Sequence, residues 1–260
     1  MKIIYEGQNG FLIQHNGVKI SFDLYLSNCV YERTGSGKRN YPAPCGLTEL
    51  KDIMYYFISH DHLDHLDVDT VRGLVEIAPN IVFICPYPHM HLLKDCGVSM
   101  NNIIGAKAYQ NIELRNGISV FAIPQKHEEY TVIDGEHGNL GYVLKWDNYK
   151  FYHAGDAIAD KKLADDLREA GPFDVMFVPI NGHDWKRFEN DIMGNMTYRE
   201  ALDLCDYAGT EYVIPMHYDL FDNNTENPAF FVDYLYREYS GQKFKMFMPG
   251  EKMILENKDD

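Results

Sequence analysis

Three histidines and two aspartates occupy six consecutive positions of the chain, residues 60–65. Imidazole nitrogens and carboxylate oxygens are the groups with which proteins bind divalent metals at neutral pH, and one cluster can supply ligands to two metal ions. The structural alternative is a polar loop in which histidines fall close together by chance. The density of His-x-His-x-Asp-His favours the metal site, with His60, His62, Asp64 and His65 as candidate ligands.

The cluster directly follows residues 53–58, a short apolar and aromatic run that is typical of a buried strand. It is therefore expected on the loop that leaves the end of this strand. Open α/β sheets place their binding sites at this position.

Residues 60–65 alone cannot close two metal sites, because each metal needs three or more protein ligands. Three later positions carry a His or Asp just beyond an apolar strand: His127, Asp156 and His217. His137 is the alternative to His127, but it precedes a strand that begins at Leu140 instead of following one. His127 is preferred for this reason.

The chain has 260 residues, 45% of them hydrophobic, and is expected to form a single domain over residues 1–260. Its net charge of −15 with scattered Lys and Arg argues against nucleic-acid partners and against anionic membranes. Metal ions could still attract a small anionic substrate. A small-molecule substrate is thus the expected partner. The sequence is also compatible with a homo-oligomer.

The five cysteines are widely spaced and leave one without a pair, which favours a reducing compartment. Residues 1–6 lack the apolar segment of a signal peptide, and no stretch is long enough to span a bilayer. The sequence therefore predicts a soluble, cytoplasmic protein.

The first quarter of the chain predicts β-structure, because residues 11–13 and 18–22 flank the hairpin signal Asn16-Gly17. Residues 25–48 are expected to form a long connection, of the kind that is usually functional or mobile. Asp67 is expected to cap a helix. On the next helix, between residues 86 and 97, His89 and His91 point to different faces and are expected to be surface or partly buried residues.

The rest of the chain predicts strands and helices in alternation. Thr197 and Glu200 form a capping box, and Asn227-Pro228 starts a later helix. This order predicts sheets covered by helices on their outer faces. The strands are expected at residues 81–84, 118–123, 140–146, 149–153, 175–178 and 212–214.

The cluster, a later lone His, Gly-Asp after a strand and a final His after another strand together resemble the metallo-β-lactamase superfamily. The resemblance implies an α+β, four-layer αβ/βα sandwich of two mixed sheets with helices on the outer faces. It also implies two divalent metal ions, Zn or Mn. It assigns His60, His62 and His127 to one metal, Asp64, His65 and His217 to the second, and Asp156 to both.

Two metals that share a water can lower its pKa and polarise a scissile group, which makes a hydrolase the expected enzyme. Asp156 would fix the separation of the metals. Asp64 could orient the water and pass a proton to the leaving group. These two aspartates are the candidate catalytic residues.

Three segments, residues 152–156, 195–201 and 214–219, resemble the L-ascorbate-6-phosphate lactonase branch of the superfamily. The resemblance implies a small sugar-acid lactone, with or without phosphate, as substrate. A phosphodiesterase acting on a small molecule or cyclic nucleotide, a thioesterase or glyoxalase-like hydrolase, and a non-enzymatic metal-binding module are the alternatives. A substrate phosphate would need cations, and the candidates are Lys126, Lys186, Arg187, Arg33, Lys38 and Arg39.

Two further histidines fall near these positions. His153 lies within its strand and is expected to support the site by hydrogen bonding. His183 follows the strand at residues 175–178, where contact with substrate and plain loop polarity are equally compatible with the sequence.

Overall fold

The computed structural model describes residues 1–256, which cluster into two compact units. The first unit comprises residues 1–107, residues 132–138 and the segment that begins at Phe247. The second unit comprises residues 108–131 and 139–246. Within the described part of the chain, no helix has the length and apolar character needed to cross a membrane.

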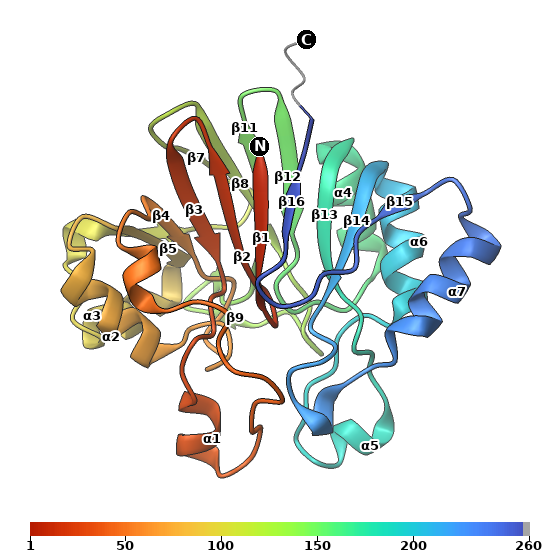
Figure 1. The fold of residues 1–260 in the computed structure, drawn as a ribbon, viewed down its shortest axis with the longest axis horizontal. Coiled ribbons are helices and arrows are strands. Elements are labelled where there is room, and N and C mark those ends of the chain that lie inside the picture. Colours follow the sequence, from red (N-terminus) through yellow and green to blue (C-terminus); the bar gives the residue numbers. More distant parts are fainter. Residues whose placement is uncertain (257–260) are drawn as a thin grey trace. The chain divides into compact units, whose positions relative to one another are not determined.

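The first unit is built on a seven-stranded mixed sheet, and Figure 1 labels all of its strands except β6. Its strand order is β16-β1-β2-β3-β4-β5-β6, antiparallel from β16 to β3 and parallel from β3 to β6. Because β3, β4 and β5 are parallel, their carboxyl ends lie at the same edge of the sheet. The strands are β1 (Lys2–Gly7), β2 (Gly10–His15), β3 (Val18–Phe22), β4 (Tyr55–Phe57), β5 (Val82–Pro86), β6 (Ile103–Ala106) and β16 (Lys252–Ile254).

The expected hairpin is confirmed: β2 and β3 pair around Asn16 and Gly17, whose φ angles of 48° and 77° fit a tight turn of this type. Strand β4 lies where the apolar run at residues 53–58 predicted it. The stacked rings of Phe22 and Phe57, with centroids 4.8 Å apart, join β3 to β4 in the core.

Helix α2 (Val68–Ile77) begins at Asp67, whose carboxylate accepts hydrogen bonds from the backbone of Asp69 and Thr70, as predicted. Its apolar face, with Val71 and Leu74, packs into the core that also holds β4 and β5. The remaining helical segments of this unit are α1 (Cys29–Thr34), η1 (Leu47–Leu50), η2 (Tyr87–His89), α3 (Met90–Asp95) and η3 (Met100–Asn102).

Two expectations for the first unit were wrong. Residues 25–48 are not a continuous irregular connection, because they contain α1, which ends at Gly35 in the left-handed region. His89 is not a surface residue: it is 3% exposed, and its Nε2 lies 2.9 Å from the carbonyl oxygen of Gly138, a contact distant in sequence. His91 is exposed, as expected.

The second unit is built on another seven-stranded mixed sheet, of order β15-β14-β13-β12-β11-β8-β7. Strands β12 to β15 run parallel, and β7, β8, β11 and β12 pair antiparallel. The strands are β7 (Asn111–Glu113), β8 (Ile118–Pro124), β11 (Leu140–Trp146), β12 (Tyr149–His153), β13 (Phe173–Pro179), β14 (Thr210–Met216) and β15 (Lys243–Phe244).

The helices of the second unit begin at the caps that the sequence predicted. Thr197 and Glu200 form the capping box of α6 (Tyr198–Ala208), and Asn227 caps α7 (Pro228–Glu238). Helices α4 and α6 pack against each other and onto strands of this sheet. The other helical segments are α4 (Lys161–Ala170), α5 (Trp185–Phe188) and η4 (Asp222–Asn224).

Two mixed sheets with helices were predicted and are confirmed. A short third sheet pairs β9 (Val132–Ile133) with β10 (Glu136–His137). The assignment of residues 1–260 to a single domain stays a prediction.

Candidate functional site

The predicted cluster lies on the loop between β4 and α2 of the first unit. The loop turns on itself because the backbone amides of His65 and Leu66 both donate to the carbonyl of His62, at 3.0 and 2.8 Å. The ring of His60 lies 4.5 Å from that of His62 and 4.1 Å from that of His65, measured between centroids. The loop therefore gathers the three imidazoles at one place.

Asp23, at the end of β3, organises two of these histidines. Its carboxylate accepts hydrogen bonds from the Ser59 amide (2.8 Å) and the Ser59 hydroxyl (2.6 Å), and its Oδ2 lies 2.9 Å from His65 Nδ1. The Ser59 hydroxyl oxygen lies 3.0 Å from His60 Nδ1. Since the hydroxyl proton goes to Asp23, both imidazoles carry their proton on Nδ1 and present the Nε2 lone pair, as a metal ligand must.

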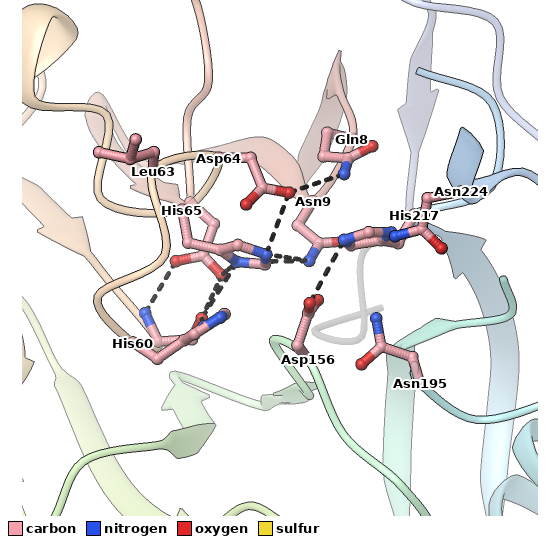
Figure 2. Close-up of polar contacts among 12 residues, drawn as sticks. Gln8, Asn9, His60, Leu63, Asp64, His65, Asp156, Asn195, His217 and Asn224 are labelled. Atoms are coloured by element: carbon pink, nitrogen blue, oxygen red, sulfur yellow. Dashed lines mark hydrogen bonds and ion pairs between the residues drawn. The ribbon is translucent and has the colours of Figure 1, made fainter. Parts of the chain in front are cut away.

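The turn between β1 and β2 supplies two further contacts. Gln8 donates from Nε2 to Asp64 Oδ2 at 2.9 Å, and Asn9 Nδ2 lies 3.2 Å from His65 Nε2 (Figure 2). Gln8 is 1% exposed and has a φ of 54°, a conformation that costs free energy for a residue with a side chain. The turn therefore holds the Asp64 carboxylate in one orientation.

The second unit carries its own cluster at three strand ends. His127 follows β8, Asp156 follows β12 and His217 follows β14. One carboxylate oxygen, Asp156 Oδ2, lies 3.6 Å from His127 Nε2 and 3.3 Å from His217 Nε2; Figure 2 draws the second contact. All three residues are at most 4% exposed. A single carboxylate that faces two imidazoles is an arrangement suited to bridging two cations.

A backbone contact fixes two of these three strand ends relative to each other. The Ile158 amide donates to the Lys126 carbonyl at 2.7 Å and so joins the Asp156 loop to the His127 loop. His153 Nδ1 accepts a hydrogen bond from the Gly155 amide at 3.2 Å, so His153 contacts the turn that carries Asp156. His217 has a φ of 59°, so the end of β14 holds a strained backbone at a candidate ligand.

Three asparagines form a chain of side-chain hydrogen bonds in the same unit. Asn195 Nδ2 donates to Asn181 Oδ1 at 3.1 Å, and Asn181 Nδ2 donates to Asn224 Oδ1 at 2.8 Å. Asn195 and Asn181 are fully buried. Among the residues that the structure describes, Asn195 Oδ1 is a buried acceptor without a hydrogen-bond partner. A buried acceptor of this kind needs a donor from elsewhere.

The remaining sequence candidates have definite places. His127, and not His137, lies beside Asp156, whereas His137 is on β10 of the first unit, where burial lowers its pKa. His183 is partly exposed, and its Nδ1 lies 2.9 Å from the Asn195 carbonyl oxygen. This histidine therefore anchors its own loop.

Several candidate phosphate cations serve the fold. Arg33 forms a bidentate pair with Asp69, with both N···O distances 2.8 Å. Arg187 pairs with Asp184 and donates to the Thr225 carbonyl. Arg39 donates to the backbone carbonyls of Tyr25, Ser27 and Tyr41. Lys38 and Lys186 are exposed.

The donor sets suit a divalent cation. Each unit presents buried imidazoles together with carboxylate oxygens, a set that Zn²⁺ and Mn²⁺ both accept. Cys29, Asp67 and Asp69 form another group of ligand types, but Asp67 already accepts bonds from Ser27, Thr70 and their neighbours. Burial also raises the pKa of the Cys29 thiol to about 12. This group is structural.

Comparison with solved structures defines the class of fold. A metallo hydrolase from the archaeon Ignicoccus hospitalis is 22% identical and has a TM-score of 0.75 over 99% of both chains. A family model described as a beta-lactamase superfamily domain matches residues 24–218. The chain therefore belongs to the beta-lactamase superfamily, as the sequence motifs predicted.

The chain is also similar to curated proteins. A UPF0173 metal-dependent hydrolase of Pyrococcus furiosus is 26% identical over 98% of this chain and 100% of the relative. The N-acyl-phosphatidylethanolamine-hydrolyzing phospholipase D 1 of Caenorhabditis elegans is 27% identical over 70% of this chain and 54% of the relative. The chain spans 54–59% of the length of the first curated relatives that it matches.

Proposed function

We propose that this protein is a metal-dependent hydrolase with a dinuclear centre, the arrangement that the resemblance to the metallo-β-lactamase superfamily implies. In this proposal His60, His62 and His127 bind the first metal, Asp64, His65 and His217 bind the second, and Asp156 bridges them. The observation that carries the proposal is the placement of Asp156 Oδ2 between the imidazoles of His127 and His217. The beta-lactamase superfamily model spans all seven of these residues, because it matches residues 24–218.

Two Zn²⁺ or Mn²⁺ ions, when bound, would activate a water molecule and polarise the scissile bond. The protein's own contribution is positioning. Asp23 and Ser59 fix the proton positions of His60 and His65, and Gln8 orients Asp64, which is suited to exchange a proton with the leaving group. Asn195 Oδ1 offers an acceptor to a hydroxyl group or water.

Two bonds are candidates for hydrolysis. The lactone ester is favoured by residues 152–156, 195–201 and 214–219, which resemble the ascorbate-6-phosphate lactonase branch. The phosphodiester is favoured by the similarity to the phospholipase D of Caenorhabditis elegans. We expect a small-molecule substrate and no nucleic-acid or membrane partner, because the net charge is −15. A cytoplasmic location is supported by the five cysteines, which are all free thiols.

Metal analysis tests the centre. Protein purified without chelators should contain up to two Zn or Mn per chain, and His60→Ala and Asp156→Ala should each reduce this content and the hydrolytic rate. His91→Ala is the matched control, since it removes an exposed histidine of the first unit. Full metal occupancy in both ligand variants would contradict the assignment.

A substrate panel separates the two reactions. Lactones, phosphodiesters and thioesters, each with and without a phosphate group, should be compared by kcat/KM. A preference for lactones supports the first candidate. Activity confined to unphosphorylated phosphodiesters would replace it with the second.

A further inference from the structure

The second unit contains a cavity of about 330 Å³ next to α5. This volume is at the lower end of the range for small-molecule pockets. Its lining is largely apolar and includes Ile158, Trp185, Phe188 and Ile192. Glu128, His183 and Asp184 also line it, and among the described residues the lining contains no lysine or arginine.

One side of the cavity is formed by the loops that carry candidate metal ligands. Glu128 directly follows His127, and Ile158 lies two positions after Asp156. The Met196 amide donates to the Ala157 carbonyl at 2.7 Å, which joins the segment that follows Gly194, another lining residue, to the Asp156 loop. A molecule in this cavity would therefore lie next to the ligands of its own unit.

Another part of the lining comes from α5, which exposes two large aromatic side chains. Trp185 is 74% exposed and Phe188 is 66% exposed, whereas the other tryptophan, Trp146, is 1% exposed. The helix is held in place, because Asp184 accepts hydrogen bonds from the amides of Lys186 and Arg187. Fixed apolar side chains that remain open to water beside a cavity are typical of a ligand-binding surface.

We propose that this cavity binds the apolar part of the substrate, an alkyl or acyl chain, while the scissile bond lies at the metal ligands. The inference rests on the proposed hydrolase function and narrows it. A largely apolar lining with two carboxylates and no lysine or arginine disfavours a phosphate group here, so the preferred substrate carries a hydrocarbon chain instead of a sugar phosphate.

Binding can be measured without turnover, because Trp185 is an exposed fluorophore at the cavity. The full chain as purified is titrated with 3-hexylcyclopentanone, an analogue of γ-decalactone that has no ester bond. We expect a blue shift of the emission and at least a twofold loss of quenching by iodide, and both changes should be absent in Trp185→Phe. Phe188→Ala should weaken binding severalfold. Phe230→Ala, which removes a 51% exposed phenylalanine on α7, should leave it unchanged.

Chain-length dependence provides the second readout. Along a series from γ-butyrolactone to γ-decalactone, kcat/KM should rise up to about fourfold for each methylene group that enters the cavity. A rise that Phe188→Ala flattens and Phe230→Ala does not supports the proposal. Hydrolysis that is independent of chain length, together with no change in Trp185 fluorescence, would overturn the proposal that the cavity binds a hydrocarbon chain. The proposed hydrolase function would still stand.

The other outcomes are also decisive. A Trp185 response without hydrolysis of any lactone or phosphodiester supports the apolar cavity and counts against the hydrolase. A response to phosphatidylcholine vesicles but not to the dissolved ketone would overturn the cavity proposal and assign α5 to a lipid surface.

Discussion

Asp23→Asn is expected to weaken metal binding although Asp23 is not itself a proposed ligand. The carboxylate holds the His65 proton on Nδ1, 2.9 Å away, and accepts the proton of the Ser59 hydroxyl. An amide nitrogen in place of Oδ2 would donate to His65 Nδ1 and move the imidazole proton to Nε2. The nitrogen left for a metal would then carry a proton.

The size of the effect follows from this change of tautomer. Partners that orient a ligating imidazole are worth about 10–100-fold in metal affinity, or about 1.4–2.8 kcal/mol. Competition against a chelator measures this affinity for Zn²⁺ and Mn²⁺. The loss of metal affinity should remain when the pH and the buffer concentration are varied.

Asp67→Asn is the matched control for this experiment. It alters a second fully buried aspartate of the first unit, which accepts several hydrogen bonds but contacts the backbone of α2 and the side chains of Ser27 and Thr70. It should lower the free energy of unfolding and leave the metal affinity unchanged. Equal affinities of wild type and Asp23→Asn, with both chains folded, would refute the reasoning.

Three further predictions concern other contacts. Gln8→Leu should lower kcat about tenfold at unchanged metal content, because a hydrogen bond to a charged group contributes about 1.5–3 kcal/mol; unchanged kcat would exclude an orienting role of Gln8. Thr197→Ala should reduce the free energy of unfolding by about 1 kcal/mol in calorimetry, through loss of the α6 cap, and no change would mean that this cap is not stabilising. Burial raises the pKa of the Cys85 thiol to about 12 from an ordinary value of 9.0. The Cys85 thiol ionises at lower pH in the unfolded chain than in the folded one. The stabilising contribution of the buried thiol is therefore complete below about pH 9. It is lost as the pH rises towards 12, by up to about 1.4 kcal/mol per pH unit. Urea unfolding at pH 8 and pH 10 should show a smaller alkaline loss for Cys85→Ala than for wild type.

Local patterns explain why much of the fold was predictable from the sequence. The hairpin at Asn16-Gly17, the cap at Asp67 and the capping box at Thr197 each depend on a few neighbouring residues, so each could be recognised in the sequence. The candidate ligands His127, Asp156 and His217 share one signal, a His or Asp directly after an apolar strand.

The residues that support the ligands were missed because their contacts are distant in sequence. Gln8 and Asp64 are 56 positions apart, and Asp23 and His65 are 42 apart. Asp23 did carry a usable signal, since it directly follows the apolar strand at residues 18–22, as Asp156 follows its own. Gln8 carried none, because a polar residue in a turn is ordinary. Helix α1 was missed because its short sequence has little helical periodicity and is followed by a segment that contains glycines and prolines.

The two ends of the segment that carries α5, residues 181–182 and 195–197, are joined to each other by backbone hydrogen bonds. Gly182 donates to the Met196 carbonyl and Asn195 to the Gly182 carbonyl, both at 3.0 Å, and Asn181 pairs with Thr197. Gly194 allows this closure, because a Cβ at this position would lie 2.4 Å from His183 Cβ. Residues between these anchors can therefore change in sequence or length while the strand ends beneath them keep their positions. Evolution, or a protein engineer who grafts this segment between relatives, could thus alter which molecules are accepted without rebuilding the chemistry.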